Sequence, residues 1–306
     1  NEVQRRRMQT YQGAFVYEPR PGLYKDIVVF DFRSLYPTII GSHNICPDMI
    51  DCECCKDAAQ AINDGNEKHW FCMKRKGFIP VLIEDLITRR MRIKEIIKGE
   101  RDEKFMFLDA RQNSLKLLAN SFYGYLGFFG ARWYSLESAR SVTAWGRSYI
   151  HKVIDKAQNE GFAVLYSDTD SIFITLDRKN KNDAEIFAES INLELPGLME
   201  LEYEGFYPAG IFVSAKMGPF GAKKKYALMS EQGILKIKGF ETVRRNWSLI
   251  AKNAQEKVLE IILRENDTQK ALEYVKEVIK NLKSRKIPVE EVIMHTQLQK
   301  EIVDYA

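Results

Sequence analysis

The chain has 306 residues, of which 45% are hydrophobic and 29% are charged, and it contains 17 Phe, 14 Tyr and 4 Trp. These proportions supply enough large side chains for a core and exclude a disordered chain, and no apolar run is long enough to predict a membrane span. The net charge of +4 is too small by itself to indicate a polyanionic partner.

The first predicted strand is Ile27–Phe30, a β-branched and aromatic run that ends beside Asp31. We expect it to be buried and to carry that acid at its end. The following segment, from Ser34 to Ile40, is predicted to turn at Pro37.

All five cysteines lie close together in the sequence, with His69 beside the last of them. Their C-x-C-C pattern with one distant Cys fits no standard zinc spacing. Three interpretations stay open: a zinc site, a disulfide such as Cys55–Cys72, or free thiols. The cysteines are Cys46, Cys52, Cys54, Cys55 and Cys72.

Two long helices are predicted next, and together they indicate a projecting antiparallel hairpin. The first begins at Pro80 and keeps helical periodicity to Lys98, where Gly99 ends it. The second runs from about Asp102 to Ser121.

The second half of the chain is predicted to add a helix, several strands and a helical end. The helix covers about residues 138–158, and the four residues 167–170 (S-D-T-D) have the composition of a tight turn between two strands. A cap at Asp267-Thr268 divides the C-terminal helical region. The strands are expected at residues 162–166, 171–176, 201–207, 211–214, 225–228 and 234–237.

Residues 211–250 carry an excess of six positive charges. A patch of this size can follow the phosphates of a nucleic acid, although a solvated face is an equally good interpretation. The positions are Lys216, Lys223, Lys224, Lys225, Lys236, Lys238, Arg244 and Arg245, against Glu231 and Glu241.

Strands separated by helix pairs indicate an α+β fold, with a mainly antiparallel sheet and two helical lobes. Asp31 and the Asp168/Asp170 turn are far apart in sequence, but they meet if their strands are neighbours in that sheet. Carboxylates gathered in this way hold hard cations such as Mg²⁺, whereas an Asp in an isolated turn usually only bonds its own backbone.

Three motifs around these acids resemble motifs A, B and C of family B DNA polymerases, in the same order. They are D-F-R-S-L-Y-P at 31–37, K-L-L-A-N-S-F-Y-G at 116–124 and Y-S-D-T-D-S at 166–171. The resemblance is strongest to archaeal replicative members and extends nearly end to end. It implies a DNA-templated, primer-dependent DNA polymerase in which a primer 3′-hydroxyl attacks the α-phosphate of a dNTP and pyrophosphate leaves.

The resemblance also implies a division of the chain. Residues 1–77 would be an N-terminal connector and the first part of the palm, with the cysteine loop, and residues 78–124 the fingers. Residues 125–240 would complete the palm, and residues 241–306 would begin a truncated thumb. No acidic exonuclease motif precedes Asp31, so we expect no proofreading in this chain, which is expected to be either an excised core or one part of a split polymerase.

The family's site residues transfer onto matching positions. Asp31, Asp168 and Asp170 would be catalytic, and two Mg²⁺ ions would be held by Asp31, Asp170 and the Phe32 carbonyl. The third acid would be either Glu202 or Glu204, and the sequence does not distinguish between them. The nucleotide would meet Ser34, Leu35, Tyr36 (as a gate against the 2′-hydroxyl), Arg90, Lys94, Lys116, Asn120 and Tyr123.

DNA contacts would come from Tyr11, Gly13, Thr169, Lys223, Lys224, Lys225, Tyr226, Arg244 and Arg245. Because phosphates are present in every sequence, this binding should be sequence-independent and salt-sensitive. Expected partners are primer-template DNA, dNTPs, the remaining polymerase parts and a sliding clamp. No association with a membrane is expected. The expected location is cytoplasmic, at the nucleoid if the source is archaeal.

Two departures from the family pattern stand out. Ser135 and Ser138 occupy positions where some thermophilic relatives have a Cys pair, and Met217–Gly221 has the character of an insertion before the lysine motif.

Two competing hypotheses remain. One is a catalytically silent nucleic-acid-binding subunit of a split polymerase, which would need none of the acids. The other is an RNA-synthesising or reverse-transcribing enzyme, which Tyr36 and the long fingers helices disfavour.

Overall fold

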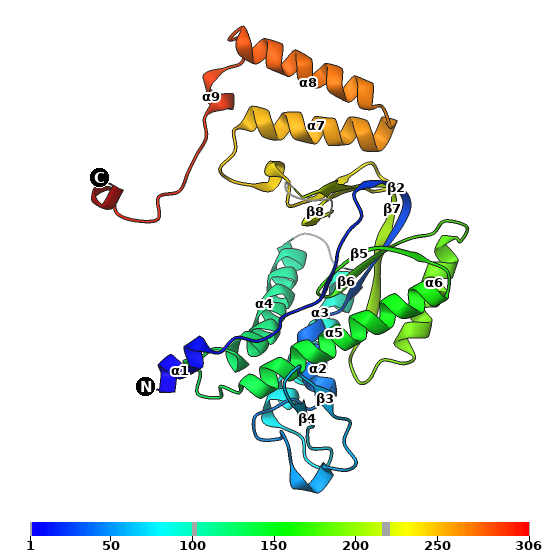
Figure 1. Ribbon diagram of the computed structural model, residues 1–306, viewed down its shortest axis with the longest axis vertical. Coiled ribbons are helices and arrows are strands. Elements are labelled where there is room, and N and C mark those ends of the chain that lie inside the picture. Colours follow the sequence, from blue (N-terminus) through cyan, green and yellow to red (C-terminus); the bar gives the residue numbers. More distant parts are fainter. Residues whose placement is uncertain (1, 100–102, 216–220, 306) are drawn as a thin grey trace.

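An antiparallel sheet forms the middle of the computed structural model, which describes residues 2–99, 103–215 and 221–305 (Figure 1). Its strand order is β1-β5-β6-β2-β7-β8-β9, so the first long strand, β2, lies at the centre. The strands are β1 (Val16–Tyr17), β2 (Gly22–Phe32), β5 (Ala163–Asp168), β6 (Ser171–Thr175), β7 (Leu201–Ser214), β8 (Gly221–Met229) and β9 (Leu235–Lys238).

The alternation of side chains along β2 separates two cores. Val28 and Phe30 face a large core that includes residues of α2 (Leu35–Ser42), α5 (Leu136–Asn159) and α6 (Lys181–Asn192). Ile27 and Val29 belong to a second, aromatic cluster on the other face of the sheet. All four side chains are fully buried, which explains why the strand reads as a continuous apolar run.

One predicted break in the sheet is wrong. Residues 201–207 and 211–214 form a single strand, β7, because the ladder continues past Pro208: Ile27 pairs with Tyr207 and Lys25 pairs with Ala209. Proline lacks only one donor, and the many other bonds between β2 and β7 hold the strand together.

The turn expected at Pro37 is also wrong, because residues 35–42 form the helix α2. Pro37 lies in its first turn, where backbone N–H groups have no partner within the helix, so proline costs no hydrogen bond there. Ser34 precedes the helix with a φ of 52°, in the left-handed region.

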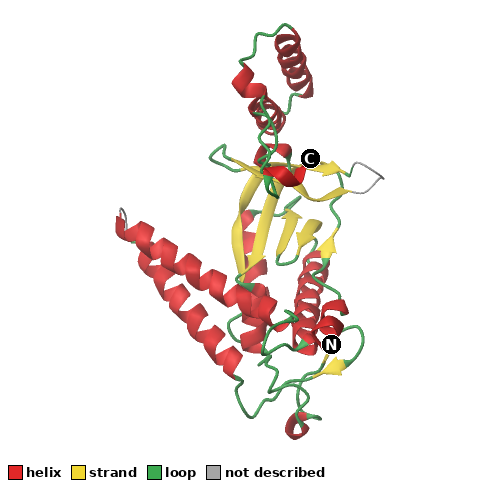
Figure 2. Cartoon of the chain, turned by 90° about the vertical axis from the view of Figure 1, so that its left-hand side faces the viewer, coloured by secondary structure: helices red, strands yellow, loops and turns green. Residues whose placement is uncertain are grey.

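The predicted helical hairpin is confirmed as α3 (Phe78–Ile97) and α4 (Glu103–Leu126), which project together away from the sheet (Figure 2). α4 extends beyond the predicted end at Ser121, and its expected start at Asp102 lies outside the described residues. α5 begins at a cap made by the two serines noted above: Ser135 Oγ accepts from the Ser138 backbone N–H at 3.2 Å and donates to the Ser138 hydroxyl at 2.8 Å.

The C-terminal region contains α7 (Leu249–Glu265), α8 (Thr268–Lys283) and the short α9 (Val289–Val292). α7 packs on the sheet, where Leu259 and Leu263 join a core with Ala227 and Met229 of β8. The predicted cap is confirmed, since the Asp267 side chain accepts from the Lys270 backbone N–H at 2.8 Å.

The remaining elements are small, and several were not predicted. They are α1 (Glu2–Met8), the pair β3 (Ile62–Asn63) and β4 (Lys68–His69), and the 3-10 turns η1 (Glu53–Cys55), η2 (Glu241–Val243) and η3 (Ile302–Tyr305). Of the suspected insertion, residues 217–220 lie outside the described residues, and Gly221 begins β8. None of the described helices has the length and apolar composition needed to cross a bilayer.

Candidate functional site

The central strand β2 brings the predicted acids together. Asp31 pairs in register with Ser171 of β6 on one side and with Glu202 of β7 on the other. The backbone N–H of Phe32 donates to the carbonyl of Asp170 at 2.8 Å, so Asp170 in the β5–β6 turn lies beside the end of β2. The structure therefore brings together acids that are far apart in sequence.

The β5–β6 turn has a fixed shape. Thr169 adopts a left-handed φ of 62°, and the Asp170 N–H donates to the Asp168 carbonyl at 2.7 Å. The Thr169 N–H donates to the carbonyl of Phe15 at 3.1 Å, and its hydroxyl donates to Asp168 Oδ1 at 3.1 Å. These contacts orient the two aspartates before any ligand binds.

The carboxylates repel one another. Burial, followed by the charges of Asp170, Glu204 and Glu202, raises the pKa of Asp31 to about 7. Burial and the charge of Asp168 also raise the pKa of Asp170. A divalent cation would relieve this repulsion, and carboxylate and carbonyl oxygens are the ligands that Mg²⁺ prefers, so the residues present fit such an ion.

The two candidates for the third acid have different partners, although both line a cavity with Asp31. Glu202 is engaged by Arg33, whose Nη2 lies 2.5 Å from Glu202 Oε1, and by Lys94 at 3.7 Å. Glu204 lines a cavity of about 380 Å³ together with Asp31, Asp168 and Asp170, and its carboxylate is paired with Lys236.

A second cavity, of about 320 Å³, joins the acids to the helical hairpin. Lys116 and Asn120, one turn apart on α4, line it opposite Asp31 and Asp170. The charge of Lys116 lowers the pKa of both aspartates, against the effect of burial. The backbone and side chains that complete the wall are those of Phe32, Ser34, Leu35, Tyr36, Pro37, Tyr123 and Thr169.

The two predicted phosphate ligands of α3 lie differently. Arg90 reaches the cavity wall, because it donates to Ser34 Oγ at 3.1 Å and to Gln112 Oε1 at 3.2 Å. Lys94 points to Glu202, with its Nζ 3.7 Å from the carboxylate.

Tyr36 and Tyr123 line this cavity, and Tyr11 contacts Tyr123 from outside its wall. The rings of Tyr36 and Tyr123 have centroids 4.5 Å apart, and the Tyr123 hydroxyl lies 2.9 Å from that of Tyr11. The segment after Tyr11 is held by Arg147 of α5, which donates to the Gly13 carbonyl at 2.8 Å. The predicted Tyr11–Gly13 segment therefore contacts the site, and Arg147, which no motif indicated, anchors it.

The lysine motif is more heavily paired than its sequence suggests. Lys223 pairs with Glu18 at 2.8 Å, Lys224 with Asp168 at 3.4 Å and Lys225 with Glu241 at 2.9 Å. Tyr226 is only 8% exposed and packs against other aromatic rings of the sheet, while its side chain also lines the cavity of the three aspartates.

Arg244 and Arg245 follow η2 and are both exposed. Neither forms an ion pair within the described part of the chain. Of the predicted DNA contacts, these two therefore have the most available charge.

Comparison with known proteins gives one consistent result. The family model for DNA polymerase family B matches residues 1–306. A DNA polymerase of Thermococcus sp. (strain 9oN-7) is 46% identical over 307 residues, which cover 98% of this chain and 38% of that protein. DNA polymerase 1 of Pyrococcus abyssi is 47% identical over 298 residues, covering 95% of this chain and 37% of that protein.

A solved structure agrees with these relatives. The family B DNA polymerase from the hyperthermophilic archaeon Pyrobaculum calidifontis matches with a TM-score of 0.71 and 33% identity, over 97% of this chain and 38% of that one. The chain thus spans less than two fifths of the length of these relatives. With a family model matched along its whole length and archaeal relatives aligned over nearly all of it, the chain belongs to DNA polymerase family B.

Proposed function

We propose that this chain carries the nucleotidyl-transfer site of a DNA-templated, primer-dependent DNA polymerase. The observation that carries the proposal is the cavity that joins Asp31 and Asp170 to Lys116 and Asn120. Acids that can hold cations then lie opposite donors that can hold a triphosphate, as phosphoryl transfer requires. The naming of the relatives as DNA polymerases supports the same reaction.

Asp31, Asp170 and the Phe32 carbonyl would hold two Mg²⁺ ions, with Asp168 and Glu204 beside them. When bound, a metal pair of this kind stabilises the attacking and leaving oxygens of phosphoryl transfer. Burial and neighbouring carboxylates raise the pKa values of Asp31 and Asp170, and a bound cation would offset that repulsion by favouring their charged forms.

Lys116, Asn120 and Arg90 would bind the phosphates of the incoming dNTP. Lys94 would join them if closure of the α3–α4 hairpin releases it from Glu202. In this proposal residues 78–124 are the fingers, residues 1–77 and 125–240 supply the palm, and residues 241–306 begin the thumb. The chain's groups orient the phosphates, and orientation with charge stabilisation provides most of the catalysis in this class of reaction.

Tyr36 would select deoxynucleotides. Its ring lies on the cavity wall, packed at an interplanar angle of 44° against Tyr123 and close to Gly146, where an added Cβ would lie 3.1 Å from Tyr36 Cε1. A ring supported on two sides has little room to yield to a 2′-hydroxyl. Ser34 and Leu35 would complete the nucleotide wall, and Tyr123 would pack near the new base pair.

Primer-template DNA would be held by exposed cations and by the Tyr11–Gly13 segment. Arg244, Arg245, Lys223 and Lys224 are exposed. Lys224 and Tyr226 line the acid cavity, Thr169 lines the nucleotide cavity, and Lys225 is paired with Glu241. Further polymerase parts and a sliding clamp are the proposed protein partners.

Primer extension with Mg²⁺ and dNTPs tests the proposal. Asp31→Asn removes a metal ligand with little change in shape, so extension should fall about 10³-fold or more while primer-template binding stays near the parent value. Asp26→Asn is the matched control, because Asp26 is exposed on the same strand and should leave extension unchanged. Extension by Asp31→Asn at a rate within tenfold of the parent would contradict the assignment of Asp31 as a metal ligand. Binding of DNA without any extension by the parent chain would favour the silent nucleic-acid-binding subunit.

A further inference from the structure

Outside the polymerase site, four sulfur atoms converge in the loop between α2 and α3. We propose that Cys52, Cys54, Cys55 and Cys72 bind a single Zn²⁺ ion as a structural site. The cysteines of the described chain are all free, so the disulfide considered for Cys55–Cys72 is absent from this structure.

The spacing of the sulfur atoms fits tetrahedral zinc. All four lie within 4.8 Å of one another, and Cys54 Sγ is 3.7 Å from both Cys55 Sγ and Cys72 Sγ. A Zn–S bond of about 2.3 Å in a tetrahedron puts neighbouring sulfurs about 3.8 Å apart. Four thiolates fill every position, which is typical of a structural ion and not of a catalytic one.

The fold explains how an unusual spacing produces this cluster. The 3-10 turn η1 (Glu53–Cys55) lets neighbouring residues face the same point. Cys72 is brought there by an antiparallel contact, in which the Asp51 N–H donates to the Trp70 carbonyl at 2.8 Å and the Cys72 N–H donates to the Met49 carbonyl at 2.9 Å.

His69 does not belong to the cluster, although it lies close to Cys72 in the sequence. Its Nδ1 is 2.8 Å from Asp51 Oδ2, and its Nε2 faces Asp64 at 3.8 Å. Both ring nitrogens are therefore directed at carboxylates, so the ligand set is sulfur only.

Backbone N–H groups hydrogen-bond to two sulfur atoms of the cluster, as they do to sulfur ligands in metal-binding turns. The Met73 backbone N–H donates to Cys55 Sγ at 3.3 Å. The backbone N–H groups of Lys74 and Arg75 hydrogen-bond to Cys72 in the same way.

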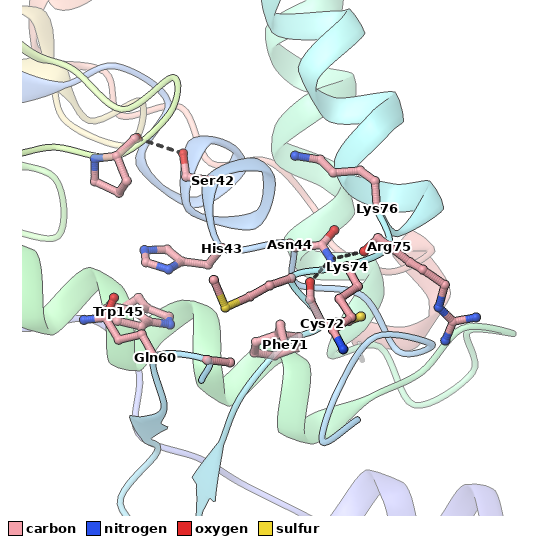
Figure 3. Close-up of a pocket in the computed structure, with 13 residues that line it drawn as sticks. Ser42, His43, Asn44, Gln60, Phe71, Cys72, Lys74, Arg75, Lys76 and Trp145 are labelled. Atoms are coloured by element: carbon pink, nitrogen blue, oxygen red, sulfur yellow. Dashed lines mark hydrogen bonds between the residues drawn. The ribbon is translucent and has the colours of Figure 1, made fainter. Parts of the chain in front are cut away.

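The ion would brace the start of the fingers hairpin. Asn44 Nδ2 donates to the carbonyls of Cys72 at 2.7 Å and Arg75 at 2.8 Å, and Asn44 Oδ1 accepts from the Gly77 N–H, which precedes α3, at 2.8 Å. Figure 3 shows Asn44 between Cys72 and Arg75 at the wall of a cavity of about 550 Å³. The loop between α2 and α3 has little regular structure beyond η1, β3 and β4. A metal ion that cross-links its two ends would therefore hold the loop in one conformation.

Metal analysis of the 306-residue chain tests the proposal without reference to polymerase activity. Chain purified with Zn²⁺ and then desalted should retain about one Zn²⁺ per molecule, and Co²⁺ in its place should give the visible and sulfur-to-metal absorption bands of a tetrahedral thiolate site. Cys72→Ala should lose the metal to a competing chelator. Cys54→Ala should do the same, and because Cys54 is exposed this variant should keep the parent far-UV spectrum.

Cys46→Ala is the matched control, since Cys46 is buried outside the cluster and should leave the zinc content unchanged. Two results would overturn the proposal. One is a parent chain with five titratable thiols that takes up neither Zn²⁺ nor Co²⁺. The other is a parent chain whose mass is lower by two protons and whose peptide map contains a disulfide between cluster cysteines.

Discussion

The ion pairs of the lysine motif change the expected salt dependence of DNA binding. From the sequence alone, Lys224, Lys225, Arg244 and Arg245 would each neutralise a phosphate. In the structure, however, Lys225 Nζ donates to both oxygens of Glu241, at 2.9 and 3.1 Å, and lies 5.0 Å from the centre of the Phe240 ring. This lysine is already neutralised by the protein, whereas Arg244 and Arg245 are exposed.

The magnitude follows from counterion release. Each phosphate contact contributes about 0.9 to the slope of log K against log salt concentration. Replacing Arg244 and Arg245 by Ala should therefore lower the slope by up to about 1.8, while Lys225→Ala should change it by close to zero. Removing Lys225 should instead raise the low pKa of Glu241, which hydrogen bonding from Gln255 and then Lys225 now holds at about 2.

Fluorescence anisotropy of a labelled primer-template, titrated with protein at several NaCl concentrations, measures the slope for each variant. Lys223→Ala is a useful intermediate, because its partner Glu18 is exposed and the pair is solvated. If Lys225→Ala lowers the slope as much as the double arginine variant, the pairing with Glu241 does not persist on DNA and the reasoning is wrong.

Three further predictions test other parts of the account. Tyr36→Ala should reduce discrimination between dNTP and rNTP by about 10- to 200-fold in single-nucleotide incorporation, with Tyr24→Ala as the control, and unchanged discrimination would return Tyr36 to a purely structural role. Because the pKa of Asp31 is raised to about 7, the metal-free folded chain binds a proton that the unfolded chain releases above about pH 4, so its stability falls as pH rises from about 4 to 7. Mg²⁺ competes with that proton, and its stabilising effect on the melting temperature should be larger at about pH 8 than at about pH 5; equal effects would argue against a metal at Asp31. Asn180→Ala breaks the capping box of α6 and should lower the free energy of unfolding by about 1 kcal/mol in urea titrations, whereas Asn253→Ala, at an exposed position within α7, should not; equal changes would remove the capping explanation.

The elements that the sequence predicted well are those whose signals are local. The periodicity after Pro80 predicted α3, and the Asp267-Thr268 cap predicted the division between α7 and α8, because helices and caps depend on residues three or four apart. α2 was misjudged because Pro37 was interpreted as a turn, and the predicted gap within β7 includes Pro208. The effect of a proline depends on where it lies in a helix turn or a ladder, which only the tertiary structure determines.

The same distinction applies to the site. The meeting of Asp31 with Asp170 depends on the pairing of β2 with β6, which the motif resemblance anticipated and single residues did not. The role of Arg33 in holding Glu200 and Glu202, and that of Arg147 in holding Gly13, come from contacts between distant segments that leave no short-range pattern. The cysteine cluster likewise required the antiparallel contact that brings Cys72 beside η1.

The central claim is that Asp31 and Asp170 hold divalent cations beside the nucleotide cavity, and Mn²⁺ binding measures this directly. Electron paramagnetic resonance of free Mn²⁺, titrated into the chain with a chain-terminated primer-template and a dNTP, should show about two bound ions per chain. Asp170→Asn should lose at least one of them while Asp26→Asn keeps both. Two ions bound by Asp170→Asn with unchanged affinity would contradict the account.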